Sequence, residues 1–403
     1  MEKAESKSGP LANVRVLDLG TMIAGPMAGT LMSDFGAEVI KIEQPNIGDT
    51  LRGVGPFSRG ESLWFAVDGR NKKSITLDLR HPEGKRLLCE LVAKSDVVIE
   101  NFRPGTLSKW KLSYDTLSAV NPSIIMLSVS GFGQNGPYAG RAGYDRIGLA
   151  FSGVMGLTGY PDRPPVRVGT SIADYSTALM GAYAVMMALY HRDARGGTGQ
   201  QIDLALYESM FRFSDSLVSA YDQLGLVRRR NGNVHFGAVP GDTFETKDGR
   251  YMIVSISSDA MFERMCRAMK RPDLLEEPKY ATHALRYESV EELNGIAGGW
   301  IKATPVEVVC AALEENGIPF SIVLTIDDMV HDPQYAARQN IATIEHPKLG
   351  PLRMPGVIPK LSATPGEIRS AAPAIGEHND EIYRTLLRLD GKEMQRLAAE
   401  GVI

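Results

Sequence analysis

The first 133 residues alternate between short apolar segments and longer amphipathic ones, and this alternation limits the possible folds more than any other feature. Strands separated by helices are typical of an α/β protein with a mostly parallel sheet, because each helix crosses over the sheet to reach the next strand. The segments predicted as strands and as the helices between them are the strands 14–20, 37–45, 72–79, 96–102 and 124–133 and the helices 24–36 and 82–95.

The character of the sequence changes after residue 225. A polar, turn-rich break, RRRNGN, occupies 228–233, and 244–257 predicts a β-hairpin around Asp248-Gly249 before several helical segments. A chain of 403 residues is also too long for one simple core. We therefore expect a large domain over 1–225, a smaller α+β domain over 226–330, and a last segment, 331–403, which the pattern alone assigns to neither domain.

Composition and charge exclude several classes of protein. A hydrophobic content of 43% with a net charge of -4 is ordinary for a soluble protein and gives no sign of a nucleic-acid surface. The polar N-terminus has no apolar signal segment, and the longest apolar run, Ala178 to Tyr190, is shorter than the roughly 20 residues that span a bilayer. We expect a cytoplasmic protein.

Common catalytic motifs are missing. The three cysteines are far apart and the seven histidines have no ligand spacing, so no metal site is predicted. Neither a phosphate-binding loop nor a G-x-S-x-G nucleophile motif occurs. A G-x-G-x-x-G pattern at Gly131, Gly133 and Gly136 follows a predicted strand, but the next residues hold more Gly and Pro and do not begin a helix. We interpret it as a glycine loop near a site rather than as a dinucleotide-binding motif.

A single carboxylate, Asp174, stands at the entrance of a long apolar segment, GTSIADYSTALMGAYAVMMALYHR, at 169–192. Asp is a favoured helix N-cap, and capping alone would explain it. The same position suits a nucleophile, because the positive end of a helix favours the ionised carboxylate and its backbone N–H groups can stabilise an oxyanion. The residues alone leave both interpretations open.

Several motifs along nearly the whole chain resemble the family III CoA-transferases, the group of the formyl-CoA:oxalate and crotonobetainyl-CoA:carnitine enzymes. The motifs are VRVLDLGTMIAGPMAGTLMSDFGAEVIKIEQP, NKKSITLDLRHPEGK, VVIENFRPGTLSKWKL, SVSGFGQNGPYAGRAGYD and PPVRVGTSIADYSTALMGAYAVMMAL. The resemblance places Asp174 where the family has its nucleophilic aspartate. It implies a Rossmann-like large domain, built from the N-terminal half and the C-terminal tail, with a smaller domain between.

The resemblance also implies the reaction. An enzyme of this kind moves CoA from an acyl-CoA such as succinyl-CoA to a carboxylic acid, through an aspartyl anhydride and an aspartyl-CoA thioester. No tightly bound cofactor is implied, because CoA and its thioesters are the substrates. Family positions that lie along CoA match, in this chain, Thr21, Met22, Ile23, Ala24, Gln44, Leu77, Arg80, Asn101, Phe102, Arg103, Lys109, Arg141, Tyr144 and Asp145. Gln44 stands where some members have an arginine.

The same superfamily contains α-methylacyl-CoA racemases, which form the alternative function. Their catalytic histidine would match Tyr144, and tyrosine is a poor general base near neutral pH, so a transferase is favoured. The acceptor stays open between a dicarboxylate, an aryl-succinate and a carnitine-like acid. Family chains interlock in pairs, so we expect a homodimer, with a heteromer of related subunits as the alternative.

Overall fold

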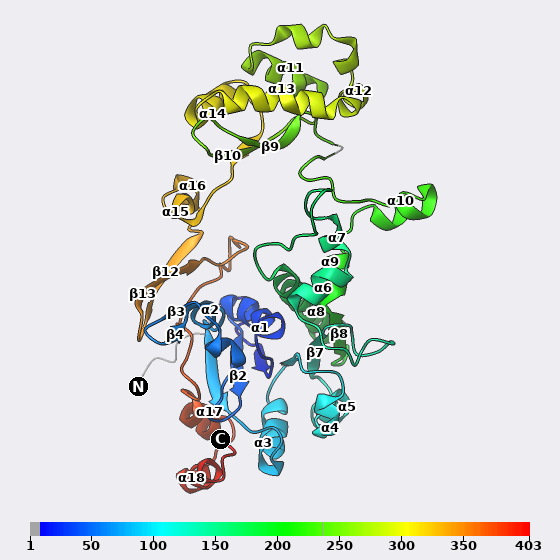
Figure 1. Ribbon diagram of the computed structural model, residues 1–403. Coiled ribbons are helices and arrows are strands. Elements are labelled where there is room, and N and C mark those ends of the chain that lie inside the picture. The colour runs from blue at the N-terminus through cyan, green and yellow to red at the C-terminus, as the bar shows by residue number, and fades with distance from the viewer. Residues whose placement is uncertain (1–8, 236) are drawn as a thin grey trace. The chain divides into compact units, whose positions relative to one another are not determined.

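The structure, a computed structural model, describes residues 9–235 and 237–403. Two compact units divide the chain (Figure 1). The larger unit contains the residues up to Met155 with Arg167–Val227 and Gln334–Ile403, and the smaller contains Gly156–Val166 and Arg228–Pro333. The division into domains at residues 226 and 331 stays a prediction.

Six parallel strands form the central sheet of the larger unit, in the order β5-β2-β1-β6-β7-β8. Their bounds are β1 Arg15–Asp18, β2 Glu38–Glu43, β5 Lys72–Thr76, β6 Val97–Glu100, β7 Ile125–Ser130 and β8 Gln201–Ala205. After β1 the chain adds β2 and β5 on one side of the sheet, and it then adds β6, β7 and β8 on the other side. The direction in which strands are added therefore reverses between β1 and β6. Ligands of open α/β sheets bind outside the carboxyl ends of the strands at such a point. The expected α/β class with a parallel sheet is confirmed.

The last strand, β8, is the one that the sequence analysis did not predict. It lies at the edge of the sheet, and β7 is the one strand of the described residues that pairs with it. Its segment QIDLA alternates polar and apolar side chains instead of forming a continuous apolar run. An edge strand with one solvated face gives this weaker signal, whereas buried parallel strands are apolar on both faces.

Helices cover both faces of this sheet. The helices, 3₁₀ turn and short strands of the larger unit are α1 Ala24–Asp34, η1 Thr50–Gly53, β3 Phe57–Ser58, β4 Glu61–Ser62, α2 Leu63–Asp68, α3 Pro82–Val92, α4 Thr106–Lys109, α5 Tyr114–Val120, α6 Asp145–Phe151, α7 Val154–Leu157 (which runs two residues past the boundary of the unit), α8 Ile172–Arg195, α9 Leu206–Phe211, α10 Leu217–Leu224, α16 Pro333–Ala337, β12 Ile341–His346, β13 Gly350–Pro355, α17 Asn379–Thr385 and α18 Gly391–Ala399.

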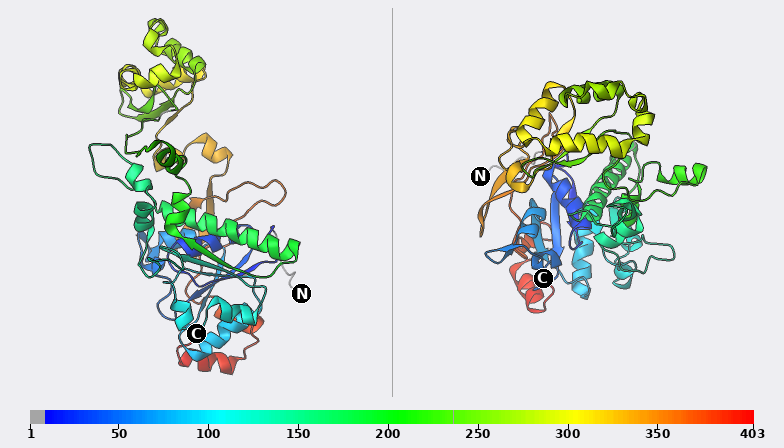
Figure 2. Two further views of the ribbon diagram at one scale, coloured as in Figure 1. Left: turned by 90° about the vertical axis from the view of Figure 1, so that its right-hand side faces the viewer. Right: turned by 45° about the horizontal axis from the view of Figure 1, so that its top comes forward.

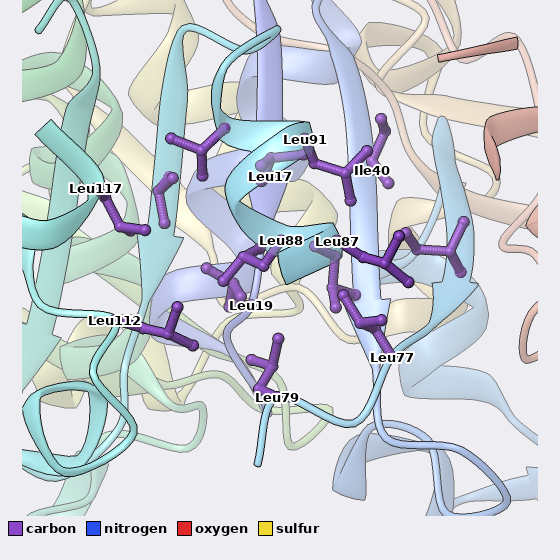
Figure 3. Close-up of a cluster of buried hydrophobic side chains, with 14 of the residues drawn as sticks. Leu17, Leu19, Ile40, Leu77, Leu79, Leu87, Leu88, Leu91, Leu112 and Leu117 are labelled. Atoms are coloured by element: carbon purple, nitrogen blue, oxygen red, sulfur yellow. The ribbon is translucent and has the colours of Figure 1, made fainter. Parts of the chain in front are cut away.

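Alternate side chains of the inner strands β1, β2, β6 and β7 enter the two cores on either face of the sheet. Leu17 of β1 belongs to one core with Leu87 and Leu91 of α3 (Figure 3). Its neighbour Val16 belongs to the other core, with Ala178 of α8. Because both faces are covered, β1, β6 and β7 are mainly apolar, whereas β2 and β5 were predicted although they also carry charged side chains.

The C-terminal segment returns to the edge strand β5. The hydroxyl of Tyr383 in α17 donates to the carbonyl oxygen of Thr76 at 2.6 Å, and Asn379 Oδ1 accepts from the Thr76 N–H at 2.8 Å. Tyr383 is fully buried in the same core as Leu17. These contacts explain why residues after 350, which resembled neither domain in sequence, group with the larger unit.

The smaller unit has its own core around an antiparallel sheet of order β11-β10-β9. Its elements are β9 Gly241–Glu245, β10 Tyr251–Ser255, α11 Asp259–Ala268, η2 Pro272–Leu275, η3 Pro278–Tyr280, α12 His283–Glu288, α13 Val290–Lys302, α14 Val306–Glu315, β11 Phe320–Ile322 and α15 Ile326–Met329. The hairpin predicted around Asp248-Gly249 joins β9 to β10, and Gly249 there has a φ of 77°. The Arg230 guanidinium donates to three carbonyl oxygens of Gly156–Arg163, which ties this segment to the unit.

One helix among the described residues, α8, is long and apolar enough to cross a membrane by length and composition, and half of its apolar window is buried in the protein. It lies along α1 and over β7 and β8 (Figures 1 and 2). Core helices of soluble proteins pass the same test, so the length of α8 carries no conclusion about a membrane. The cytoplasmic location stays a prediction.

Candidate active site

A cavity of about 280 Å³ lies at the carboxyl ends of β1, β6 and β7, where the strand order reverses. Its walls come from the loops that follow these strands, from the segment before α6 and from the start of α8. Of the residues predicted for the site it brings together Thr21, Met22, Ile23, Ala24, Asn101, Phe102, Arg103, Arg141, Tyr144 and Asp174. All of them belong to the larger unit.

Two glycines allow the walls of this cavity to meet. A Cβ on Gly131, directly after β7, would lie 2.6 Å from Gly143 Cα, which no real side chain tolerates. Gly131 therefore lets the segment that carries Arg141 and Tyr144 approach the end of the strand. This close approach is the structural reason for the glycine-rich motif, and no helix follows Gly136 as a dinucleotide fold would require.

Asp174 occupies the third position of α8, and the interpretation of it as the helix N-cap is wrong. The cap position is Ser171, whose side chain makes no capping hydrogen bond. Instead Asp145 of α6 caps α8 from outside: its Oδ1 accepts from the N–H of Ala173 at 2.8 Å and from the N–H of Asp174 at 3.3 Å. The carboxylate of Asp174 is thus not used for capping and lines the cavity.

The same hydrogen bonds correct the expectation about an oxyanion site. The sequence suggested that free N–H groups at the start of this helix would stabilise a developing negative charge. Two of these donors, Ala173 and Asp174, already bond Asp145. A third, the Tyr175 N–H, donates to the Ser171 carbonyl at 3.0 Å. An oxyanion in this cavity would need other donors.

Burial and a like charge both act on Asp174. Desolvation, and second the negative charge of Asp145, raise the pKa of the Asp174 carboxyl to about 7. Asp145 itself is only 8% exposed. Near neutral pH the Asp174 carboxyl therefore exchanges its proton readily and is more basic than an ordinary aspartate, which suits a nucleophile.

The residue after Asp174 is anchored by a network that the sequence did not reveal. The Tyr175 hydroxyl donates to Asp68 Oδ2 at 2.9 Å and accepts from Trp64 Nε1 at 2.8 Å. Burial, more than any other cause, raises the pKa of Asp68. Three residues from α2 and α8 thus fix the first turn of α8. Trp64 and Asp68, four apart in a short apolar helix, were the available signal.

The loop between β1 and α1 is joined to the loop after β6. Asn101 Oδ1 accepts from the Thr21 N–H at 2.8 Å, and Asn101 Nδ2 donates to the Thr21 carbonyl at 2.7 Å. The next residue, Met22, has a φ of 63°, which favours glycine, and its N–H donates to Asp49 Oδ1 at 2.9 Å. The backbone at the cavity wall is therefore held on both sides.

Two arginines give the cavity positive charge. The Arg141 guanidinium stacks over the ring of Tyr138 at 3.7 Å, and Arg103 lines the wall after β6. Neither forms an ion pair with any residue in 9–235 or 237–403. Both charges are available to an anionic ligand.

A second cavity, of about 160 Å³, lies beside the first and shares Thr21, Thr50 and Phe102 with it. Its lining adds three other predicted positions, namely Gln44, Leu77 and Arg80. Phe102 packs edge-on against Trp110 at 5.2 Å between ring centres. Lys109 is exposed on α4 and lines neither cavity, so the structure does not bring it into the site.

The described residues contain no group of three or more His, Cys, Asp or Glu side chains arranged to hold a metal ion. The cavity walls instead offer a raised-pKa carboxylate, unpaired arginines and a strained loop. Whether the individual wall residues contact CoA stays a prediction.

Comparison with known proteins identifies the family of this chain. The sequence model of CoA-transferase family III matches residues 11–379. The succinyl-CoA–D-citramalate CoA-transferase of Chloroflexus aurantiacus is 42% identical, with 98% of each chain covered, and the beta subunit of the succinyl-CoA–L-malate CoA-transferase of the same organism is 44% identical, again with 98% of each chain covered.

A solved structure agrees with these relatives. The crystal structure of a CAIB/BAIF family protein from Brucella suis superimposes with a TM-score of 0.84 at 35% identity, covering 94% of this chain and 100% of that one. The family expected from the sequence motifs is confirmed, and the chain belongs to CoA-transferase family III as an enzyme that transfers CoA between carboxylic acids.

Proposed function

We propose that this enzyme moves CoA from succinyl-CoA to a short dicarboxylic acid, with Asp174 as the nucleophile. The observation that carries the proposal is the Asp174 carboxyl, with a pKa raised to about 7, in a cavity beside unpaired arginines. The relatives named above support the donor and the acceptor class, because both use succinyl-CoA and both acceptors, citramalate and malate, are dicarboxylates.

The reaction proceeds by double displacement, and its steps balance without any other reagent. The Asp174 carboxylate attacks the thioester carbonyl and expels CoA as a thiolate, which leaves a mixed anhydride of Asp174 and succinate. The thiolate attacks the Asp174 carbonyl and releases succinate, which leaves an Asp174–CoA thioester. The acceptor carboxylate then attacks this thioester, and the thiolate released again attacks the acceptor acyl group to give the new acyl-CoA and free Asp174.

The raised pKa of Asp174 fits the first step of this cycle, in which its carboxylate is the nucleophile. A more basic carboxylate attacks the thioester faster, and the cost is that only about half of the sites are ionised at pH 7. Because a thioester is exchanged for a thioester, the protein mainly has to align the reactants and exclude water from the anhydride.

Arg141 and Arg103 support an anionic substrate. A dicarboxylate that attacks Asp174 through one carboxylate brings a second negative charge into a cavity that already holds Asp174 and borders Asp145. A guanidinium held over Tyr138, as that of Arg141 is, can pair with this second carboxylate bidentately. CoA itself carries a pyrophosphate and a 3′-phosphate, and Arg103 in the first cavity and Arg80 in the second are cations that could bind them.

The racemase alternative receives no support from the cavity. Tyr144, at the position of the expected histidine, is 69% exposed, and no histidine of the described residues lines the first cavity. The histidine that a racemase would use at the α-carbon is therefore missing from this cavity, and Asp174 is its one carboxylate among the described residues.

Trapping of the covalent intermediate tests the proposal. The protein is incubated with succinyl-CoA, treated with hydroxylamine or borohydride, digested, and examined by peptide mass spectrometry, with the Asp174→Ala protein as control. A modification at Asp174 is expected, and an acceptor screen with citramalate, malate, glutarate and carnitine then ranks the acids. An unmodified Asp174 in a protein that transfers CoA would overturn the proposed nucleophile. Activity with carnitine alone would overturn the acceptor class.

A second copy or a related subunit covers the exposed side of α8 in the assembly that we propose. Leu179, Tyr183, Met187 and Tyr190 lie along one side of this helix and are 58%, 60%, 51% and 61% exposed. So much apolar surface is unusual on a monomer. The relative named as a beta subunit supports a heteromer as the alternative to a homodimer. Light scattering on the purified chain is expected to give a dimer mass, and Tyr183→Arg is expected to weaken the dimer.

A further inference from the structure

Four charged side chains form a buried cluster directly beneath the loop that carries Met22. Asp18, Lys41, Asp49 and Lys72 are all 3% exposed or less. Asp18 and Lys41 are register partners on β1 and β2, Lys72 begins β5, and Asp49 lies in the loop after β2. We refer to these four residues as the ion cluster.

The charges of the ion cluster balance. Lys41 Nζ lies 2.7 Å from Asp49 Oδ2 and 3.6 Å from Asp18 Oδ2, and Lys72 Nζ lies 2.9 Å from the same Asp18 oxygen. Burial alone would lower the pKa of Lys41, but the carboxylates of Asp18 and Asp49 outweigh it and raise that pKa. Buried ion pairs of this kind often contribute no more stability than apolar side chains of the same volume would. Stability by itself is therefore a weak reason for four buried charges here.

Hydrogen bonds from the ion cluster hold the backbone of two residues of the loop, Gly20 and Met22. The Gly20 N–H donates to Asp18 Oδ1 at 3.0 Å, and the Gly20 carbonyl accepts from Lys41 Nζ. Asp49 Oδ1 accepts from the Met22 N–H at 2.9 Å. Between them, Thr21 is bonded at both its N–H and its carbonyl by Asn101.

The backbone conformation of Met22 shows the effect of these hydrogen bonds on the loop. Its φ of 63° lies in the left-handed region, which a residue with a β-carbon adopts only when its surroundings hold it there. Met22 lines the first cavity together with Asp174. Lys41 and Asp49 form the floor of the second cavity, but their charged atoms are directed to each other and to the loop.

We propose that Lys41 and Asp49 are positioning residues, which hold the loop of residues 20–22 in a strained conformation so that a CoA thioester meets Asp174 in line. This inference rests on the proposed function, because it assigns the loop to the binding of the CoA thioester. Alignment of this kind contributes to rate through the geometry of the bound reactant, so a small shift of the loop has a large effect.

The test compares Asp49→Asn with the matched control Asp34→Asn. Asparagine at position 49 keeps an oxygen that can accept from the Met22 N–H but removes the charge that pairs with Lys41. Asp34 is also buried and ion-paired, with Arg70 at 2.6 Å, yet makes no hydrogen bond to residues 19–24 in the part of the chain that the structure describes. A general loss of stability lowers Tm in both variants.

Two readouts separate positioning from stability. Amide hydrogen exchange of the peptide over residues 19–24 is expected to speed up about tenfold or more in Asp49→Asn and less than about twofold in the control. The kcat/KM for succinyl-CoA is expected to fall about tenfold in Asp49→Asn alone, with the KM for the acceptor nearly unchanged. Equal exchange and equal kcat/KM in the two variants would overturn the proposal.

Two further arms keep the test decisive. If Asp49→Asn does not fold, the double variant Asp49→Asn/Lys41→Gln keeps the ion cluster neutral overall, and the same two differences from the control are expected. If the wild-type protein transfers CoA from no donor, the proposed function fails. The exchange measurement then still decides whether the ion cluster holds the loop.

Discussion

Two buried regions near the first cavity shift the pKa of a carboxyl group in opposite directions. At the start of α8, Asp174 and Asp145 lie together with no cation bonded to either of them in the described chain, and the pKa of Asp174 is raised. Beneath the loop after β1, Asp49 is bonded to Lys41 and to two backbone N–H groups, and these contacts outweigh burial and lower the pKa of Asp49. Both regions are buried, so burial alone does not explain the difference.

The two regions suit different roles: the carboxylate of the first is reactive, and the carboxylates of the second hold the backbone rigid. A carboxylate that is desolvated and left near a like charge stays basic and available for attack, at a cost to stability. A carboxylate that is fully paired is inert but can fix the backbone around it. Removal of a charge should therefore have opposite effects on the free energy of unfolding in the two regions.

Loss of the reactive carboxylate should give the largest effect. Asp174→Ala is expected to lower kcat by about 10⁴-fold or more, because no other carboxylate lines the first cavity among the described residues. Steady-state rates with succinyl-CoA and each candidate acceptor measure it. Asp380→Ala, which removes an aspartate from the first turn of α17, is the matched control and should keep full activity. A loss of less than about tenfold in Asp174→Ala would show that Asp174 is not the nucleophile.

Removal of one charge from the paired region should mainly destabilise the protein. Lys41→Met leaves Asp18 and Asp49 buried with one cation between them, and we expect the free energy of unfolding to fall by about 3 kcal/mol. Denaturant unfolding at pH 7 measures the change. Lys302→Met, which breaks an exposed ion pair with Glu245, should change the same quantity by less than about 1 kcal/mol. Equal changes in the two variants would contradict the role of burial.

Removal of the charge from the reactive region should instead stabilise the protein. The folded-state pKa of Asp174 lies above its usual value of 3.8, so the folded state binds the proton more tightly and loses stability as the pH rises from about 4 to 7. Asp174→Asn should therefore raise the free energy of unfolding by about 1–3 kcal/mol at pH 8, and much less at pH 4, where the wild-type carboxyl is already protonated. Unfolding curves at the two pH values measure this, and a variant that is less stable than wild type at pH 8 would contradict it.

The sheet and the family were accessible from the sequence because their signals are local. A buried strand such as Val97–Glu100 begins with a run of three apolar residues, and residues that match a family motif keep their order along the chain. The cavity at the ends of β1, β6 and β7 follows from the strand order, which the motifs imply. Edge strand β8 was missed because half of its side chains are polar.

The ion cluster and the true cap of α8 were not accessible in this way. Asp145 caps a helix that begins 27 residues later, and Asp49 bonds Met22 across 27 residues, so neither contact has a local pattern. Lys41 reads as an ordinary polar residue in VIKIE, and only the register with β1 shows that it faces Asp18. Asp174 at the entrance of an apolar helix looked like a cap because the residue that caps it is distant in sequence.

A substitution can remove the negative charge of Asp145 and keep its hydrogen bonds. Of the four predicted effects, the effect of this substitution should be the smallest. Asp145→Asn keeps an oxygen that accepts from the N–H groups of Ala173 and Asp174 but removes the charge that, after burial, raises the pKa of Asp174. Removing a negative charge favours the ionised form, so the acid limb of kcat/KM, which reports the free enzyme, should move from near pH 7 to lower pH, by on the order of half a unit. Asp145→Ala removes the cap as well, and it should add a loss of about 1 kcal/mol in stability. An acid limb that stays near pH 7 in Asp145→Asn would mean that burial alone sets the pKa of Asp174, and the comparison between like-charged and paired carboxylates would then reduce to a difference in desolvation.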